Sequence, residues 1–325
     1  MPGGEQLLSL VHKGVWMPAG RLYASRSWRA RPRYGVVALR LAALFFVVAV
    51  VTRVVAYHWP PTTASADEPA ARAPQGRPPA VVPTARPRTG ARSPQAAVKA
   101  AAAVGESHGY RVAVAVLDRR TGAVYAAGDG AAFPSASVVK VFVAARLLVD
   151  GRHRDPATED LMRRMIVASD DNAATALYPV AGGEGLAAWI NQRYGTRGIG
   201  ASPKPGAWYL TRITARAVVR FYAAVAEDEL VGPWLVDAMA QTAATGSDGF
   251  PQHFGIPEAT TGWRIKQGWM CCVNDRSYVH STGFVNDDRY AVALLAEGTR
   301  DAYGGGRAVL SQMARALMPG GTIPG

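Results

Sequence analysis

Three short motifs in this chain carry hydroxyl and amino groups of the kind that attack a carbonyl carbon. The first is Ser137-Val-Val-Lys140, at the start of an apolar stretch that is expected to be helical. Residues three apart share a helix face, so the Lys140 amine can reach the Ser137 hydroxyl. Backbone N–H groups at a helix N-terminus are unpaired and favour a developing anion. The motif therefore offers a nucleophile, a base and part of an oxyanion hole.

The other two motifs follow later in the chain. Ser169-Asp170-Asp171 precedes a predicted helix, and Lys266-Gln267-Gly268-Trp269 lies on a predicted strand. Alone, a Ser-x-x-Lys sequence is common by chance, and a serine that starts a helix is usually only its N-cap. However, the chain has few lysines, which argues against coincidence. They are Lys13, Lys99, Lys140, Lys204 and Lys266.

In this order, the motifs resemble the Ser-x-x-Lys, Ser-Asp-Asn and Lys-Thr-Gly signatures of class A β-lactamases and penicillin-binding serine hydrolases. The resemblance covers roughly residues 94–320. It implies an α+β fold in which an antiparallel sheet flanked by helices packs on an all-helical lobe, with the active site between them. It also implies an acyl-enzyme formed at Ser137 with a β-lactam or a D-Ala-type wall peptide.

The order of predicted elements agrees with that family. A helix over residues 96–106 leads into a hairpin of strands 110–118 and 123–127, and a helical middle section follows the Ser137 motif. Three strands, 263–270, 277–284 and 289–296, precede a closing helix over 307–318. Strands on both sides of an all-helical section therefore predict one sheet assembled from the two ends of the domain.

The resemblance assigns a role to each motif residue. Ser137 is the nucleophile, and Lys140 is its base when the amine is neutral, a state that burial and a second cation nearby both favour. Ser169 relays a proton to the leaving nitrogen; its alternative role is the N-cap of a helix that begins near Asn172. Lys266 attracts a substrate carboxylate and is the second cation. The backbone N–H groups of Ser137 and Trp269 form the oxyanion hole.

Two positions depart from the family pattern. The third residue of Ser-Asp-Asn is Asp171, and an asparagine comes one position later, at Asn172. An amide can donate to a substrate carbonyl, whereas a carboxylate cannot, and Asp171 can also keep Lys140 protonated. Either Asp171 fills the third substrate-binding position or a one-residue shift brings in Asn172. In the last motif, Gln267 replaces threonine as a substrate-binding residue, and Gly268 permits close approach of a ligand.

One part of the family's machinery is absent. Class A β-lactamases activate the deacylating water with a glutamate on a loop after the Ser-Asp-Asn helix, but residues 185–226 contain no Asp or Glu. The expected loop, 194–211, offers Lys204 and Tyr209, with Asn191 nearby, and Glu184 is expected to be a helix-start charge. Stable acylation or slow turnover is therefore expected.

Other signatures of chemistry are missing. The sequence has no Gly-x-Ser-x-Gly elbow, His-Glu-x-x-His motif or Walker-type motif, so no metal and no cofactor is expected. The six histidines are scattered, and His280, on a predicted strand, is expected to be structural. Cys271 and Cys272 are adjacent, a spacing that rarely forms a disulfide. Two free thiols on a strand are therefore expected.

The charge distribution argues against nucleic-acid binding. The net charge is +12, but residues 1–100 hold 14 Lys and Arg against 3 Asp and Glu, whereas residues 101–325 are nearly neutral. The basic excess is therefore outside the globular part, which is long enough for one full core. A monomer without a nucleic-acid partner is expected.

The N-terminal part has the layout of a membrane anchor. A basic cytoplasmic segment, 1–34, precedes an apolar run over 35–59, which is long enough to span a bilayer if Arg40 and Arg53 reach the interfaces. Nine prolines between positions 60 and 94 indicate a disordered linker, 60–93, before the hydrolase domain, 94–321. Upstream basic residues predict an extracytoplasmic domain. A retained single-pass anchor in the cell membrane is favoured, and the alternative is secretion after cleavage near Ala66.

Together these observations predict an exported serine hydrolase related to class A β-lactamases. It would act on a β-lactam or related amide, tethered to the membrane and close to peptidoglycan. Two alternatives stay open: a peptidoglycan DD-peptidase or esterase-like hydrolase on the same fold, and a non-catalytic module that binds cell wall. Covalent modification that depends on Ser137 distinguishes the enzymes from the binding module.

Overall fold

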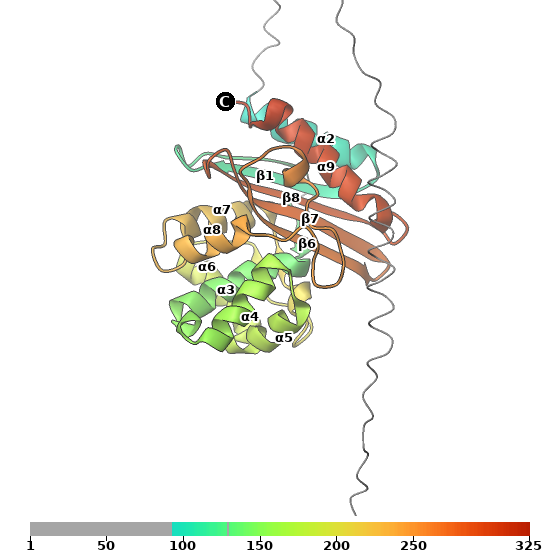
Figure 1. The fold of residues 1–325 in the computed structure, drawn as a ribbon. Coiled ribbons are helices and arrows are strands. Elements are labelled where there is room, and N and C mark those ends of the chain that lie inside the picture. Colours follow the sequence, from blue (N-terminus) through green and yellow to red (C-terminus); the bar gives the residue numbers. More distant parts are fainter. Residues whose placement is uncertain (1–92, 129) are drawn as a thin grey trace, which may run out of the picture. The chain divides into compact units, whose positions relative to one another are not determined.

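The computed structural model of this protein describes residues 93–128 and 130–325. Figure 1 shows helices on both faces of a single large antiparallel sheet. The predicted membrane segment, 35–59, and all but the last residue of the predicted linker lie outside the described residues. No helix in the described part combines the length and the apolar character needed to cross a bilayer.

The elements follow the order expected from the sequence. The helices are α2 (Pro94–Ser107), α3 (Lys140–Val149), α4 (Pro156–Val167), α5 (Asp171–Val180), α6 (Leu186–Tyr194), α7 (Ala215–Ala226), α8 (Gly232–Ala240) and α9 (Gly306–Leu317). The strands of the large sheet are β1 (Arg111–Asp118), β2 (Val124–Gly128), β6 (Arg264–Val273), β7 (Arg276–Val285) and β8 (Tyr290–Thr299). The predicted first helix, hairpin, three late strands and closing helix are therefore confirmed, with ends that differ by a few residues.

The sheet joins the two ends of the domain. Its strand order is β2-β1-β8-β7-β6, so β1 from the N-terminal hairpin pairs with β8 from the C-terminal part. Short turns connect β6 to β7 and β7 to β8, and their residues adopt the left-handed conformations that tight hairpins require, as at Asn274 (φ 49) and Asp275 (φ 57). This order makes β6 an edge strand, with one side free of strand partners.

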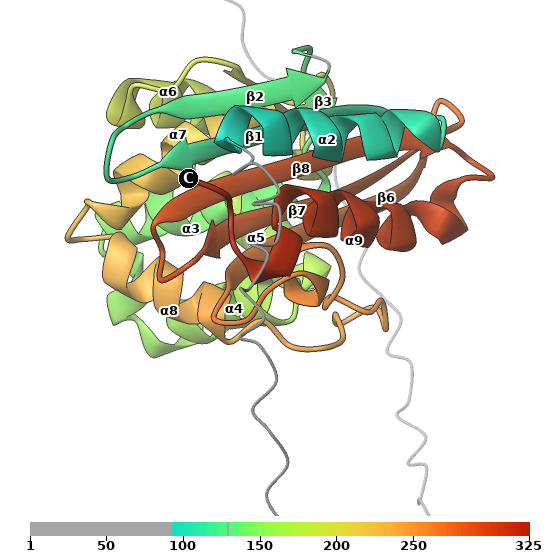
Figure 2. The same cartoon turned by 90° about the horizontal axis from the view of Figure 1, so that it is seen from above.

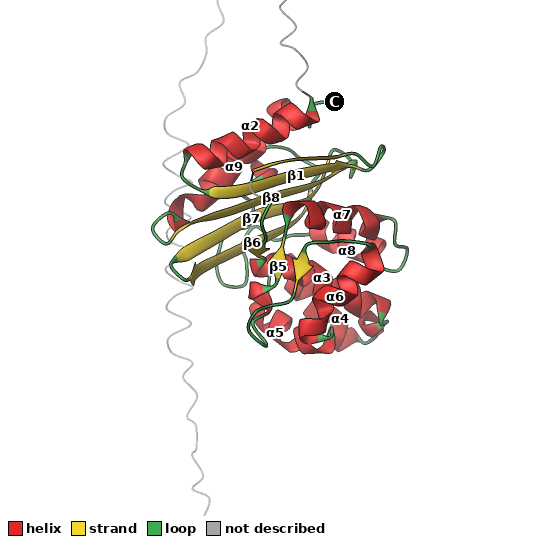
Figure 3. Cartoon of the chain, turned by 180° about the vertical axis from the view of Figure 1, so that it is seen from behind, coloured by secondary structure: helices red, strands yellow, loops and turns green. Residues whose placement is uncertain are grey.

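The central strands are buried on both faces, which divides the core in two. Along β1, Val112, Val114 and Val116 face α2 and α9, whereas Ala113 and Ala115 face the helical region. Figure 2 shows α2 and α9 lying side by side across one face of the sheet. Figure 3 shows the remaining helices gathered against the other face. The expected α+β fold with a separate helical region is therefore observed.

Local sequence signals fix where the helices begin. Ser93 caps α2 by accepting from the Ala96 N–H, with Pro94 in the first turn. Asp155 caps α4 in the same way, before Pro156. In the helical region, the Phe142 and Phe221 rings meet edge to face at 4.7 Å and pack α3 against α7. The Asp155 cap and the contact between Phe142 and Phe221 stabilise the helical region that faces β6.

A smaller sheet lies beside the Ser137 motif. It consists of β3 (Phe133–Pro134), β5 (Arg212–Ile213) and β4 (Ile199–Gly200), in the order β3-β5-β4. The Ser135 N–H donates to the Thr211 carbonyl at 2.7 Å, which continues the pairing toward Ser137. The chain after α6 is thereby fixed next to the predicted nucleophile.

Candidate active site

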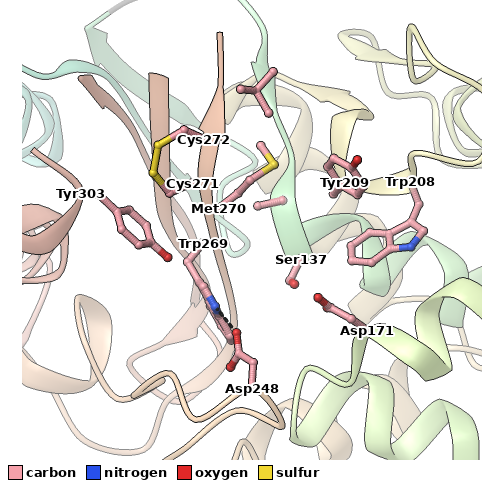
Figure 4. A pocket seen from close by; sticks show the side chains of 12 residues that line it. Ser137, Asp171, Trp208, Tyr209, Asp248, Trp269, Met270, Cys271, Cys272 and Tyr303 are labelled. Atoms are coloured by element: carbon pink, nitrogen blue, oxygen red, sulfur yellow. Dashed lines mark hydrogen bonds between the residues drawn. A yellow bond between two sulfur atoms is a disulfide. The ribbon is translucent and has the colours of Figure 1, made fainter. Parts of the chain in front are cut away.

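A pocket of about 410 Å³ lies between the edge strand β6 and the helical region (Figure 4). One wall is formed by Ala136, Ser137, Asp171, Trp208 and Tyr209. The opposite wall is formed by Asp248, residues 269–273 of β6 and Tyr303. The pocket therefore lies between the sheet and the helical part, the place at which the sequence predicts the active site.

Ser137 lies in a short 3₁₀ turn, η1 (Ala136–Val139), and not in an α-helix as expected; α3 begins only at Lys140. Ala136, directly before it, has φ 45, a conformation that L-residues with a side chain rarely adopt and that is often found at functional sites. Ser137 is only 5% exposed, and its side chain points into the pocket (Figure 4). Within the described residues its hydroxyl has no hydrogen-bond partner, so it is free to meet a ligand.

Two contacts hold this turn against the sheet. A Cβ atom on Gly268 of β6 would lie 2.9 Å from the Ser135 carbonyl oxygen, so only glycine allows the turn to approach so closely. His280 of β7 is completely buried, and its Nε2 lies 2.8 Å from the Pro134 carbonyl oxygen. Burial lowers the pKa of His280 to about 4, so the neutral ring donates from Nε2 to that carbonyl. The expected structural role of His280 is thereby confirmed.

Next to the turn that carries Ser137, two buried amines meet at one hydroxyl. Lys266 Nζ lies 2.8 Å from Ser169 Oγ, and Lys140 Nζ lies 3.2 Å from the same atom. Lys140 also donates to the Ser169 carbonyl at 2.7 Å. Both lysine side chains are fully buried. The structure therefore brings the serine of the second motif together with the lysines of the first and third.

The two lysines differ in what surrounds them. Burial lowers the pKa of Lys140, but its ion pair with Asp171, at 2.6 Å, opposes that effect. Burial lowers the pKa of Lys266 well below its usual value, and the charge of Lys140 lowers it further. Lys266 forms no ion pair among the described residues. Lys140 is therefore the better protonated of the two amines, and Lys266 is the closer to neutrality.

The structure also locates the residues that follow Ser169. Asp171 lines the pocket, whereas Asn172 is exposed on α5 and outside the pocket lining. No one-residue shift brings Asn172 to the third position. The N-cap of α5 is Asp170, which accepts from the Ala173 N–H at 3.0 Å, so Ser169 does not have the alternative capping role. Asp170 therefore has a structural role as the cap of this helix.

The backbone of Trp269 faces the pocket side of β6. The Ile265 carbonyl accepts from Thr242 Oγ1 at 2.9 Å and not from strand β7. The backbone N–H and C=O of Ile265 therefore point to the free edge of β6. The N–H and C=O of a residue in an antiparallel strand point the same way, and alternate residues repeat the direction. Trp269, four residues later, therefore presents its N–H to the free edge. The Ser137 N–H lies in the first turn of η1, where N–H groups lack partners within the turn.

Gln267 is not where the sequence analysis expects it. Its side chain is completely buried, and Nε2 donates to the carbonyls of Gln252 and Phe254, at 2.9 and 2.6 Å. The amide points to the segment behind β6 because an extra methylene and a second donor let glutamine reach those carbonyls. The expectation that Gln267 contacts the substrate is therefore wrong in this structure. Through these two hydrogen bonds, Gln267 instead holds residues 252–254 of the segment that precedes β6.

The loop that should carry a deacylating base carries none. Trp208 and Tyr209 reach the pocket from it, Lys204 is exposed, and Asn191 donates to the Ile199 carbonyl at 2.7 Å. Glu184 accepts from the Gly206 N–H at 2.7 Å, so it anchors this loop and is not merely a helix-start charge. The loop therefore adds no carboxylate to the pocket, and the carboxylates of the pocket lining, Asp171 and Asp248, come from other segments.

Several pocket residues were missed by the sequence analysis. Asp248 accepts from the indole Nε1 of Trp269 at 2.8 Å, and Trp208 and Tyr303 supply aromatic surface (Figure 4). The Gly246–Gly249 sequence predicts a turn, but nothing in its spacing indicates that the turn meets β6. Cys271 and Cys272 are joined in a disulfide that lines the same wall, so the expectation of two free thiols is wrong. In the described part of the chain, no group of His, Cys, Asp and Glu side chains is arranged to hold a metal ion.

Comparisons with known proteins agree with this architecture. The chain is 31% identical over 253 residues to the putative lipoprotein LppW of Mycobacterium tuberculosis and of Mycobacterium bovis, covering 74% of this chain and 80% of each relative. A class A β-lactamase from Bacteroides cellulosilyticus has a similar structure, with a TM-score of 0.55 and 17% identity over 70% of this chain and 98% of that one. A class A β-lactamase from Mycobacterium abscessus gives a TM-score of 0.55 and 15% identity, over 69% and 98% of the two chains.

A sequence model described as "Beta-lactamase enzyme family" matches residues 150–319. That range begins after Ser137 and includes both Ser169 and Lys266. The match spans more than half of the chain. The protein therefore belongs to the β-lactamase enzyme family.

Proposed function

We propose that this protein is an exported serine hydrolase that forms an acyl-enzyme at Ser137 with a β-lactam or related amide. The observation that carries the proposal is a buried serine whose hydroxyl faces a pocket, on the same turn as Lys140, which joins Ser169 and Lys266 in one cluster. In the described structure that cluster makes no hydrogen bond to the Ser137 hydroxyl. In proteins, a nucleophilic serine needs a proton acceptor within reach and donors for the oxyanion. This cluster and the two backbone N–H groups supply groups of both kinds.

The proposed chemistry uses the cluster as one unit. Ser137 Oγ attacks the carbonyl carbon, and its proton passes to a neutral amine of the Lys140–Ser169–Lys266 group. The negative charge on the carbonyl oxygen is stabilised by the N–H groups of Ser137 and Trp269. The carbon–nitrogen bond then breaks, and Ser169 returns a proton to the leaving nitrogen. The product is an ester between Ser137 and the acyl part of the substrate.

Deacylation is proposed to be slow. Hydrolysis of the ester needs a general base beside the attacking water. The loop that carries Trp208 and Tyr209 supplies no carboxylate, and Asp171 is paired with Lys140. On the opposite wall, both oxygens of Asp248 accept hydrogen bonds. The acyl-enzyme should therefore accumulate, because its formation has the necessary groups and its breakdown lacks one.

The location is also proposed from two observations. The basic segment and apolar run of residues 1–59 favour a single-pass anchor with the hydrolase domain outside the cytoplasm. The mycobacterial relatives are named putative lipoproteins, which are attached to a membrane by lipid. Both point to an exported domain held at the membrane, within reach of peptidoglycan.

Intact-mass measurement of the purified protein with a penicillin tests the proposal. A single adduct that forms, persists and is absent from Ser137→Ala is the expected result. An adduct that vanishes as fast as it forms would contradict slow deacylation. If a penicillin leaves the protein unmodified while an activated ester acylates Ser137, the substrate class is wrong and the nucleophile is right.

A peptidase that acts on D-Ala-type wall peptides is a second candidate. The missing deacylating carboxylate favours it, because such an enzyme does not need rapid hydrolysis of a β-lactam ester. Release of D-alanine from a model peptide, absent in Ser137→Ala, would identify it. A non-catalytic wall-binding module is favoured only by the ion pair that keeps Lys140 protonated. Any covalent adduct at Ser137 excludes that module.

A further inference from the structure

The charged side chains that line the pocket are both carboxylates. Asp171 lies on the helical wall and Asp248 on the sheet wall, with Ser137 between them in the view of Figure 4. No Lys or Arg belongs to the pocket lining. A substrate that reaches Ser137 therefore passes two negative groups and meets no exposed positive one.

The two carboxylates are not equally neutralised. Asp171 is paired with the buried ammonium of Lys140 at 2.6 Å. Asp248 has no ion-pair partner in the described part of the chain, and its two oxygens accept from neutral donors, the Phe250 N–H at 3.0 Å and the Trp269 indole at 2.8 Å. These bonds hold the Asp248 carboxylate in place without an ion pair, although the buried Lys140 and Lys266 lie close enough to interact with its charge.

The buried lysines do not make the surface of the pocket positively charged. Lys266 would be the natural partner of a substrate carboxylate, but it is fully buried and donates to Ser169 and to the Gln267 carbonyl. Gln267, the other expected carboxylate ligand, donates to backbone carbonyls away from the pocket. The groups that would recognise an anionic substrate are thus absent from the pocket surface.

The walls beside Asp248 suit a cation. Trp269 stacks on Phe250 with ring centroids 4.7 Å apart and planes 8° apart, so its indole is held rigidly. Trp208 and Tyr209 face it across the pocket, and Tyr303 lies on the Asp248 side (Figure 4). Aromatic faces together with a carboxylate are the usual surroundings of an ammonium group. Both indoles already have a lysine amine over the ring, with Lys140 Nζ 4.8 Å from the Trp208 centroid and Lys266 Nζ 5.8 Å from the Trp269 centroid.

We infer that the acyl donor of this enzyme carries an ammonium group that binds at Asp248, and that the pocket discriminates against donors with a carboxylate there. This inference rests on the proposed acylation of Ser137 and names its substrate class. A penicillin, whose own carboxylate makes it an anion, would then acylate Ser137 against this charge.

Three matched nitrophenyl esters test the inference on the purified full chain. Their acyl chains have equal length and end in a trimethylammonium group, in its neutral tert-butyl isostere, or in a carboxylate. In each reaction a bond forms between Ser137 Oγ and the acyl carbon, the serine proton passes to the amine cluster, and nitrophenolate leaves. The rate constant is measured from nitrophenolate release, and the adduct is measured by intact mass.

The cationic ester should acylate Ser137 at least about fivefold faster than the neutral ester, and the anionic ester should be the slowest. In Asp248→Asn, the cation-to-anion rate ratio should fall by at least about fivefold, and high salt should lower it in the wild type. Asp287→Asn, which removes an exposed carboxylate from the β7–β8 turn, is the matched control and should keep the wild-type ratio. Equal rates for the three esters, or a ratio unaltered in Asp248→Asn, would overturn the inference while leaving acylation intact.

Failure of the proposed function gives a different result. In that case none of the esters modifies the wild type more than Ser137→Ala. Equilibrium binding of an alkyl trimethylammonium ion, followed by tryptophan fluorescence, then tests the ammonium site without any reaction. Binding that weakens in Asp248→Asn supports the site, and binding equal to that of the neutral isostere rejects it.

Discussion

Lys140 and Asp171 form an ion pair of 2.6 Å in which the ammonium is fully buried while the carboxylate side chain is 66% exposed. The pair puts a negative charge beside an amine that must be neutral to accept a proton. Burial lowers the pKa of Lys140, and Asp171 raises it. The family's asparagine at this position carries no charge, so the aspartate changes the pH at which the amine becomes available.

Replacement of Asp171 by asparagine restores the family's Ser-Asp-Asn motif and should move acylation to lower pH. The rate should rise with pH as the Lys140 and Lys266 amines lose a proton, and Asp171 raises the pKa of both. Because Asp171 raises the pKa of Lys140, its removal lowers that pKa, and the rising limb of the profile shifts toward acid. The pH dependence of the acylation rate, measured with the neutral ester, checks this. A rising limb that does not move in Asp171→Asn, or one that moves equally in Asp287→Asn, would show that Asp171 does not set the pKa of the base.

Gly268→Ala should lower the acylation rate strongly and the free energy of unfolding only moderately. The new Cβ would lie 2.9 Å from the Ser135 carbonyl oxygen and 3.1 Å from the Val138 side chain, so the turn that carries Ser137 must move away from β6. A displacement of about 1 Å in a reacting group lowers a rate by about 100-fold, and overpacking costs about 1 to 3 kcal/mol. Acylation rates and urea unfolding measure the two effects separately.

Gly185→Ala is the control for that substitution. A Cβ at Gly185 has nothing within 4 Å, and Gly185 has no positive φ. This variant should acylate at the wild-type rate. If Gly268→Ala also acylates normally, close approach of β6 is not what positions Ser137.

Gln267→Thr restores the family's Lys-Thr-Gly motif but should destabilise this protein. Threonine is too short to reach the Gln252 and Phe254 carbonyls, which Gln267 holds at 2.9 and 2.6 Å. Loss of these buried hydrogen bonds should lower the free energy of unfolding by about 2 kcal/mol. Urea denaturation measures the change. Gln241→Thr, at an exposed position where the glutamine bonds only Asp237, should alter stability by less than about 0.5 kcal/mol. Equal effects of the two substitutions would contradict this account of Gln267.

Much of the fold is predictable from local patterns in the sequence. The turn residues that separate the last three strands give their number and order, and capping residues give the helix starts. The resemblance of the three motifs explains why Lys140, Ser169 and Lys266 lie together. The short 3₁₀ turn at Ser137 was missed because it is followed without a break by the apolar residues of α3, so that the two together look like one helix.

What the sequence does not reveal depends on contacts between distant segments. Asp248 is in a Gly-rich turn, and only packing of that turn against Trp269 brings its carboxylate into the pocket. Gln267 looks like a conservative change within a motif, but its longer side chain reaches the Phe254 carbonyl behind β6. The disulfide of Cys271 and Cys272 was missed for another reason. Disulfides between adjacent cysteines are rare because of their geometry, so this general rule predicted free thiols where the structure has a disulfide.

Burial of His280 should make the folded protein sensitive to mild acid. The pKa of His280 is lowered to about 4 in the folded state, whereas an exposed histidine has a pKa of about 6.5. Between these values the unfolded chain binds a proton that the folded chain does not, so stability is lost as pH falls. From pH 7 to pH 5, this one residue should lower the free energy of unfolding by about 2 kcal/mol. Urea unfolding at the two pH values measures the total change.

Two substitutions isolate the contribution of His280 to that change. In His280→Asn, the amide can still donate toward the Pro134 carbonyl but does not titrate, so the difference between pH 7 and pH 5 should shrink by about 2 kcal/mol, even if the variant is less stable at both. His108→Asn removes an exposed histidine and should keep the wild-type difference. A pH dependence unaltered in His280→Asn would assign the acid sensitivity to other groups.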